Sequence, residues 1–153
     1  MSNLKNHIRL GTRASELALR QTRFVIAQLQ HLVPVLTFVE RPLATPGDRD
    51  QQTPLTASPA DFFTRDLDEH ILRGDLDAAV HSAKDLPDPI PAGLDWFWLP
   101  WREDPRDTLV CRAGLTPATL PANARIGVSS PRRIDYCRHR FPTAQLLAIR
   151  GDI

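Results

Sequence analysis

Apolar residues in the first part of the chain recur with the spacing of a strand, a helix and a second strand. Residues 8–12 form a short, mostly apolar run followed by a turn, which predicts a buried strand. Ser15 is a suitable N-cap, and apolar residues recur at helical spacing over 18–32 until Pro34 ends the helix. Residues 35–40 predict a second strand.

A proline-rich loop, a second helix and two more strands are expected next. Residues 42–60 hold four prolines and few large apolar groups, which predicts a long loop. Asp61 is a candidate N-cap for a helix that ends just before Gly74. Residues 77–81 and 94–99 predict strands, and the alternation of strands with helices is typical of a parallel α/β layer.

A charged segment interrupted by proline separates this layer from a second one. We expect a first α/β lobe over 1–100, a hinge over 101–107 and a partial second lobe over 108–153. In the second lobe the pattern predicts strands over 108–111, 125–128 and 145–149, and a helix over 131–140. The chain stops directly after a predicted strand, so we expect this lobe to be incomplete.

The composition restricts the class of protein. The 153 residues are 42% apolar and 24% charged, with 19 basic and 18 acidic side chains, which is typical of a soluble globular protein and argues against general nucleic-acid binding. No apolar run is long enough to span a membrane and no signal peptide is recognisable, so we expect a cytoplasmic protein. Two cysteines, Cys111 and Cys137, are too few for a disulfide framework or a zinc site, and we expect no metal.

Two arginines fall in the first turn of the helix predicted after residue 130. Ser129 and Ser130 precede it, Ser130 suits the N-cap, and Pro131 suits the first helical position ahead of Arg132 and Arg133. The helix dipole disfavours cations there, and an anionic ligand would relieve that conflict. Hydroxyls, free backbone N–H groups and two guanidinium groups together predict a carboxylate or phosphate site. The alternative is a solvated pair of surface arginines.

Arginines also follow two other predicted strands. Arg13 and Ser15 lie between the first strand and the first helix, and Arg150 with Gly151 follows the last strand. Taken alone, the case of Arg13 and Ser15 is weak, and its alternative is a helix N-cap beside an exposed arginine. Since α/β proteins bind ligands outside the carboxyl ends of their strands, the coincidence of three such positions predicts a ligand crevice.

Lys84 and Asp85 are the remaining candidates for chemistry. They follow the strand predicted over 77–81, and Pro87 prevents a helix from continuing, so both residues are expected in a turn at the level of the arginines. A carboxylate among cations stays ionised and would hold an amine or stabilise a cation that develops on a substrate. The alternative is a structural ion pair in a loop.

Five segments, in order along nearly the whole chain, carry a family resemblance. They are Ile8–Ser15 with Leu17–Leu19, Val80–Pro87, Arg102–Asp107, Gly127–Arg133 and Arg150–Gly151. Together they resemble the hydroxymethylbilane synthases, also called porphobilinogen deaminases. Members of this family join four porphobilinogen units head to tail, with release of ammonia, on a covalently held dipyrromethane primer. The resemblance implies a two-lobed α/β fold like that of type II periplasmic binding proteins, with mixed or parallel sheets and helices on both faces.

The resemblance also implies a role for each candidate residue. Asp85 matches the family's catalytic aspartate, which stabilises positive charge on the pyrrole nitrogens. The residues that match positions holding the acetate and propionate groups of the primer are Lys84, Ser129, Ser130, Arg132 and Arg133. The residues that match positions around the incoming porphobilinogen and the growing pyrrole chain are Arg13, Ser15, Arg150 and Gly151. Carboxylates on every pyrrole ring account for so many cationic partners.

Several positions depart from the family pattern. Residues 56–63 replace a glycine- and lysine-rich stretch, Val128 stands where threonine is usual, and Asp152 replaces the usual asparagine. The family attaches its primer to a cysteine in a third domain, and neither Cys111 nor Cys137 matches that cysteine. We therefore expect no independent turnover from this chain. A fragment, one part of a split enzyme completed by a second chain, and a degenerate paralogue remain open.

Two other classes of function fit the same pattern. A non-catalytic carboxylate- or pyrrole-binding module, or a divergent relative of the solute-binding proteins, would share the two α/β lobes and the anion sites at strand ends. An interaction or assembly role is the third class, because an incomplete second lobe would expose a sheet edge that another chain could cover.

Overall fold

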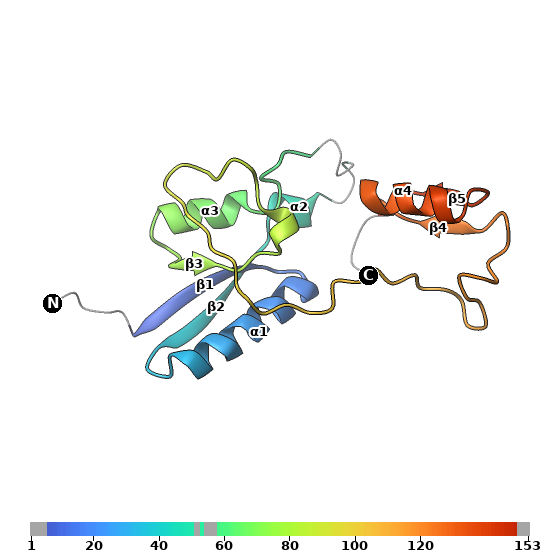
Figure 1. The fold of residues 1–153 in the computed structure, drawn as a ribbon. Helices are drawn as coiled ribbons and strands as arrows, with labels where there is room; N and C mark the ends of the chain where they lie inside the picture. Colours follow the sequence, from blue (N-terminus) through green and yellow to red (C-terminus); the bar gives the residue numbers. More distant parts are fainter. Residues whose placement is uncertain (1–5, 51–52, 54–57, 150–153) are drawn as a thin grey trace. The chain divides into compact units, whose positions relative to one another are not determined.

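The computed structural model describes residues 6–50, 53 and 58–149, and it contains two compact units, Met1–Trp101 and Arg102–Ile153 (Figure 1). The first unit contains β1 (His7–Arg13), α1 (Glu16–Leu32), β2 (Thr37–Leu43), α2 (Pro46–Arg49), α3 (Arg65–Leu72), β3 (Ala78–Ala79) and the 3-10 helix η2 (Ala83–Asp85). The second contains β4 (Arg125–Gly127), α4 (Pro131–Arg140) and β5 (Gln145–Leu147). Both units are α/β structures.

A parallel sheet with the order β2-β1-β3 forms the centre of the first unit. The pairing of β1 with β2 runs from His7 opposite Thr37 to Arg13 opposite Leu43, and β3 pairs with the other edge of β1 at Leu10. Because all three strands run in the same direction, the loops that follow β1 and β3 emerge at the same edge of the sheet. Residues from these two loops therefore meet.

Helices α1 and α3 cover opposite faces of this sheet. Thr12 is fully buried and accepts a 2.8 Å hydrogen bond from the hydroxyl of Thr22 on α1. A Cβ placed on Gly11, the residue before it, would lie within 2.7 Å of Leu67 on α3 and within 2.5 Å of Leu76. Neighbouring residues of a strand point to opposite faces, so α1 packs on one face and α3 on the other. Leu67 is the most deeply buried apolar residue of this core.

The second unit is a smaller strand, helix, strand arrangement. β4 and β5 pair in parallel, with Arg125 opposite Gln145, and α4 connects them. Its buried apolar residues are Ile126 on β4, Val128 directly after β4, and Cys137 on α4. Cys137 therefore contributes to the packing of α4, as its place in the predicted helix suggested.

The predicted parallel α/β architecture is confirmed, but several elements differ from expectation. Thr64, not Asp61, is the N-cap of α3, and Asp61 instead pairs with Arg65 in the first turn at 2.7 Å. The loop expected over 42–60 contains the short helix α2, which the Pro46-Gly47 sequence had obscured. None of the described helices combines the length and the apolar character that a membrane span requires.

Two predicted strands are absent from the described part of the chain. Residues 94–99 and 108–111 have an extended, apolar sequence but form no ladder there. In the first of these stretches, 83% of Phe97 and 69% of Trp98 are exposed. A strand requires a neighbouring backbone to pair with, and the pattern of side chains alone cannot supply one.

Candidate functional site

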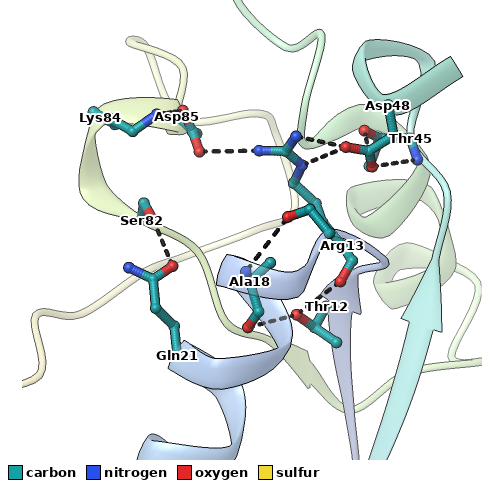
Figure 2. Close-up of polar contacts among 10 residues, drawn as sticks. Thr12, Arg13, Ala18, Gln21, Thr45, Asp48, Ser82, Lys84 and Asp85 are labelled. Carbon is teal, nitrogen blue, oxygen red and sulfur yellow. Dashed lines mark hydrogen bonds and ion pairs between the residues drawn. The ribbon is translucent and has the colours of Figure 1, made fainter. Parts of the chain in front are cut away.

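The guanidinium group of Arg13, at the end of β1, lies between two carboxylates (Figure 2). Its Nε and Nη2 donate to Oδ1 of Asp48 at 3.1 and 2.5 Å, and Nη1 lies 3.5 Å from Oδ2 of Asp85. The ring of Phe63 packs against the same group, with 4.1 Å between Cζ and the ring centroid. At most 19% of any of these three charged side chains is exposed, so their charges interact more strongly than at an open surface.

Asp85 has a cation near each of its oxygens. It ends η2, where its backbone N–H donates to the carbonyl of Ser82 at 2.9 Å. Lys84 Nζ lies 3.0 Å from Oδ1, on the side away from Arg13, and 75% of the Lys84 side chain is exposed. The turn thus combines a shielded carboxylate with an ammonium group that a ligand can reach.

Ser15 shapes the start of α1 beside Arg13. Its hydroxyl accepts a 3.4 Å hydrogen bond from the backbone N–H of Ala18, which confirms the predicted N-cap. Beneath it, the hydroxyl of Thr12 donates to the carbonyl of Ala18 at 3.3 Å. These bonds fix the first turn of α1 relative to the end of β1. From farther along α1, Gln21 accepts a 2.8 Å hydrogen bond from Ser82.

A small hollow in the first unit gathers these groups. Its lining comprises Arg13, Ser15, Leu17, Ala18, Gln21, Val80, His81, Ser82, Lys84 and Asp85. The residues come from the loops after β1 and β3 and from one face of α1. This is the edge of the sheet at which α/β proteins bind ligands.

His81 is a half-buried titratable group of this hollow. Burial lowers its pKa below the ordinary value of 6.5, and Arg13 acts in the same direction while Asp85 opposes it. Its Nε2 is buried and has no hydrogen-bond partner among the described residues. The imidazole is therefore neutral at neutral pH and adds no positive charge beside Asp85.

In the second unit, Arg132 and Arg133 share one carboxylate. Arg132 Nη2 lies 2.8 Å from Oδ2 of Asp107, and Arg133 Nε donates to Oδ1 at 2.9 Å. The hydrogen bond from Arg132, followed by that from Arg133, lowers the pKa of Asp107 below its ordinary value. About 72% of Arg132 and 53% of Arg133 are exposed, so solvent reaches both guanidinium groups. The anion expected beside this helix start is thus supplied, in this structure, by the chain itself.

The two serines before α4 differ in their contacts. Ser129 accepts a 2.9 Å hydrogen bond from the backbone N–H of Ile149 and donates to the carbonyl of the same residue, which ties the end of β4 to the segment after β5. Ser130 is the N-cap, followed by Pro131 as predicted, and its hydroxyl makes no capping bond within the described ranges. Ser130 is therefore the serine whose hydroxyl is available to an added ligand.

Comparison with known proteins identifies the family. Residues 8–153 match the family model described as "Porphobilinogen deaminase, dipyromethane cofactor binding domain". The chain belongs to the porphobilinogen deaminase family. It is 42% identical over 147 residues to the porphobilinogen deaminase of Syntrophotalea carbinolica, covering 95% of this chain and 47% of the relative. It is 41% identical over 151 residues to that of Roseiflexus castenholzii, covering 98% of this chain and 50% of the relative.

This chain therefore spans about half the length of the porphobilinogen deaminases that it matches. The structure gathers the predicted site residues in two groups, one in each unit. Arg13, Ser15, Lys84 and Asp85 surround the hollow of the first unit. Ser129, Ser130, Arg132 and Arg133 surround the start of α4. Arg150, Gly151 and Asp152 lie outside the described residues, as do residues 56 and 57 of the altered 56–63 stretch.

Three contact residues were not predicted from the sequence. Asp48 had a recognisable signal, because a threonine three residues before an acidic residue is typical of a helix start, and Thr45 takes that position here. Phe63 was noted only as part of the 56–63 stretch, and Asp107 only as part of the 101–107 hinge and of the segment Arg102–Asp107. Their contacts with arginines arise from the tertiary fold, and no local pattern reveals them.

Proposed function

We propose that this chain forms the part of a hydroxymethylbilane synthase that binds dicarboxylic pyrroles and supplies the catalytic carboxylate, Asp85. The reaction is the head-to-tail joining of four porphobilinogen units with release of ammonia. The observation that supports this proposal is the setting of Asp85: a shielded carboxylate between Arg13 and Lys84, at a hollow where two strand ends meet.

Asp85 acts by its charge. When the aminomethyl C–N bond of porphobilinogen breaks, the electron pair leaves with ammonia and positive charge develops on the pyrrole. A fixed negative charge in a shielded site stabilises that charge as it develops, without having to reorganise. Because Arg13 and the η2 backbone hold Asp85 in place, the carboxylate is oriented before the substrate arrives.

The cationic groups bind the carboxylates of the pyrroles. We assign Arg13, Ser15, Arg150 and Gly151 to the incoming substrate and the growing chain, and Lys84, Ser129, Ser130, Arg132 and Arg133 to the dipyrromethane primer. When bound, that primer supplies the terminal pyrrole carbon to which the next unit is joined. The contacts of Asp107 support this assignment, because they demonstrate that one carboxylate fits across Arg132 and Arg133.

The division of the chain into two lobes and a hinge is part of the same proposal. We infer a first lobe over 1–100, a hinge over 101–107 and a second lobe over 108–153, arranged like the lobes of a type II periplasmic binding protein. A biosynthetic role of this kind fits a cytoplasmic location.

Calorimetric titration with porphobilinogen, dipyrromethane, amino acids and inorganic oxyanions tests this function. We expect saturable binding of the two pyrroles, weaker in 0.5 M salt, with at least tenfold preference over the other ligands. Arg132→Ala combined with Arg133→Ala should weaken dipyrromethane binding, whereas Arg138→Ala, in the last turn of the same helix, serves as the matched control. Equal affinity for amino acids would favour the general binding module instead.

Ammonia release separates catalysis from binding. With porphobilinogen present, Asp85→Asn should retain pyrrole binding within about threefold and lose any measurable ammonia release, because the amide keeps the shape but not the charge. Retained ammonia release in Asp85→Asn would refute the catalytic assignment.

A further inference from the structure

Asp48 is held firmly by the start of α2. Its Oδ2 accepts hydrogen bonds from the backbone N–H of Thr45 at 3.0 Å and from the Thr45 hydroxyl at 2.8 Å. Its other oxygen, Oδ1, accepts both bonds from Arg13. Burial by itself raises the pKa of Asp48, but the hydrogen bonds from Arg13 and Thr45 outweigh it and hold the pKa below its ordinary value. Asp48 is therefore a charged acceptor with one oxygen for the helix and one for Arg13.

Gly47 gives the same short helix a second contact with Arg13, through Phe63. A Cβ at Gly47 would lie 2.1 Å from the Phe63 ring, a distance that only glycine allows. The backbone N–H of Gly47 also donates to the carbonyl of Phe62 at 3.0 Å, which holds the two segments together. The ring is thereby fixed between the α2 backbone and the guanidinium group. Neighbouring residues Gly47 and Asp48 thus immobilise Arg13 from two directions.

We propose that Asp48 is a positioning residue: it holds Arg13 so that Arg13 orients Asp85 without neutralising it, and so that Arg13 can still bind a pyrrole carboxylate. This inference rests on the function proposed above. Arginine has five N–H donors in a planar fork. Asp48 takes two and Asp85 one, which leaves two N–H groups without a partner among the described residues.

The distances explain why Asp48 is needed. A free arginine beside an aspartate forms a close two-point pair, with contacts of about 2.7–2.9 Å. Here the contact between Arg13 and Asp85 stays at 3.5 Å while that with Asp48 is 2.5 Å. Without Asp48, Arg13 would form the close two-point pair with Asp85. That pair would neutralise the catalytic charge of Asp85 and occupy N–H groups of Arg13 that would otherwise bind a ligand.

The test compares two aspartates that contact α2 or belong to it. Asp48→Asn removes the charged partner of Arg13, and Asp66→Asn removes the partner of Arg49, 2.8 Å away, without touching Arg13. Asp48→Glu restores the charge, and Phe63→Leu removes the ring alone. For each variant, NMR follows solvent exchange of the Arg13 Nε–H, calorimetry gives the Kd of porphobilinogen, and thermal unfolding gives the Tm.

We expect Asp48→Asn to speed Nε–H exchange of Arg13 and to raise the Kd of porphobilinogen about tenfold, with partial recovery in Asp48→Glu. Asp66→Asn should leave the Nε–H exchange of Arg13 and the Kd of porphobilinogen unchanged even if its Tm falls. Unchanged exchange in Asp48→Asn, or equal Kd values in Asp48→Asn and Asp66→Asn, would overturn the proposal.

Two further results have defined meanings. If Asp48→Asn does not fold, Phe63→Leu decides. Faster Nε–H exchange with a raised Kd of porphobilinogen supports the immobilisation of Arg13 by α2 and its contacts, and unchanged values refute it. If the unaltered chain does not bind porphobilinogen, the proposed function fails, and the exchange measurement still decides whether Asp48 immobilises Arg13.

Discussion

Arg13 in the first unit pairs with aspartate in the opposite way to Arg132 and Arg133 in the second unit. In the first unit, one arginine lies between two shielded aspartates and against a ring, with three N–H groups engaged. In the second unit, two arginines at an exposed helix start share the single aspartate Asp107. Exposed ion pairs contribute only about 0–1 kcal/mol, so a ligand carboxylate can replace Asp107 at little cost. Shielded groups with several contacts are instead fixed in advance, which suits a residue that must orient a reacting group.

The largest difference between the units is expected from adding one methyl group to a glycine in each. Gly47→Ala places a Cβ against the rigid ring of Phe63, and relieving that overlap should destabilise the first unit by roughly 1–3 kcal/mol. Gly127→Ala meets the half-exposed side chain of Ile149 at 2.6 Å, which can move into solvent, and should cost less. Amide hydrogen exchange of β1 and of β4 measures the two units separately. Equal losses of stability in the two units would contradict the expectation that Phe63 is held more rigidly than Ile149.

Replacing arginine by lysine should give the next largest difference. Arg13→Lys keeps the charge but cannot form the two bonds to Asp48 together with the contact to Asp85, so we expect a loss of about 1–2 kcal/mol in the first unit. Arg133→Lys, at an exposed pair, should change stability by less than about 0.5 kcal/mol. Urea unfolding, monitored through the amide hydrogen exchange of β1 and of β4, measures the loss of stability in each unit. A larger loss in Arg133→Lys would reverse the comparison.

The smallest effect concerns pH. The pKa of His81 lies below 6.5 in the folded first unit because burial disfavours its charged form. The unfolded chain therefore binds the proton first, and stability falls as the pH drops through about 6.5 towards the folded pKa. His81→Gln should flatten this slope in the first unit and leave the exchange of β4 and β5 unaffected. Identical pH slopes for the variant and the unaltered chain would exclude this role of His81.

Local signals predicted the elements that local interactions determine. Ser15 and Ser130 were recognised as helix caps, and the run of alternating strands and helices indicated the parallel sheet, because caps and periodicity depend on neighbouring residues. The positions of Arg13, Lys84 and Asp85 at strand ends were likewise predictable. Whether these residues serve pyrroles stays a prediction that the binding experiments address.

Long-range contacts account for what the sequence did not reveal. The two bonds between Arg13 and Asp48 join residues 35 positions apart, and the contact of Arg133 with Asp107 joins residues 26 positions apart. The segment 94–99 has the side chains of a strand, yet no ladder pairs with it among the described residues, because pairing depends on a second backbone. Which residue an arginine pairs with, and which backbone a strand pairs with, are determined by the tertiary fold.

The central position of β1 affects how the protein is made. Ribosomes produce the N-terminus first, so β1 emerges before either of its neighbours, and its second edge is covered only when Ala78 reaches Leu10. Until then the nascent chain carries an unpaired edge strand, the kind of surface that associates with other chains. Closing the β1–β3 pair across 68 positions is also the slow, non-local step of sheet formation. The strand that presents Arg13 thus keeps one edge unpaired until residues 78–79 have been made, and chaperone dependence should be concentrated in that interval.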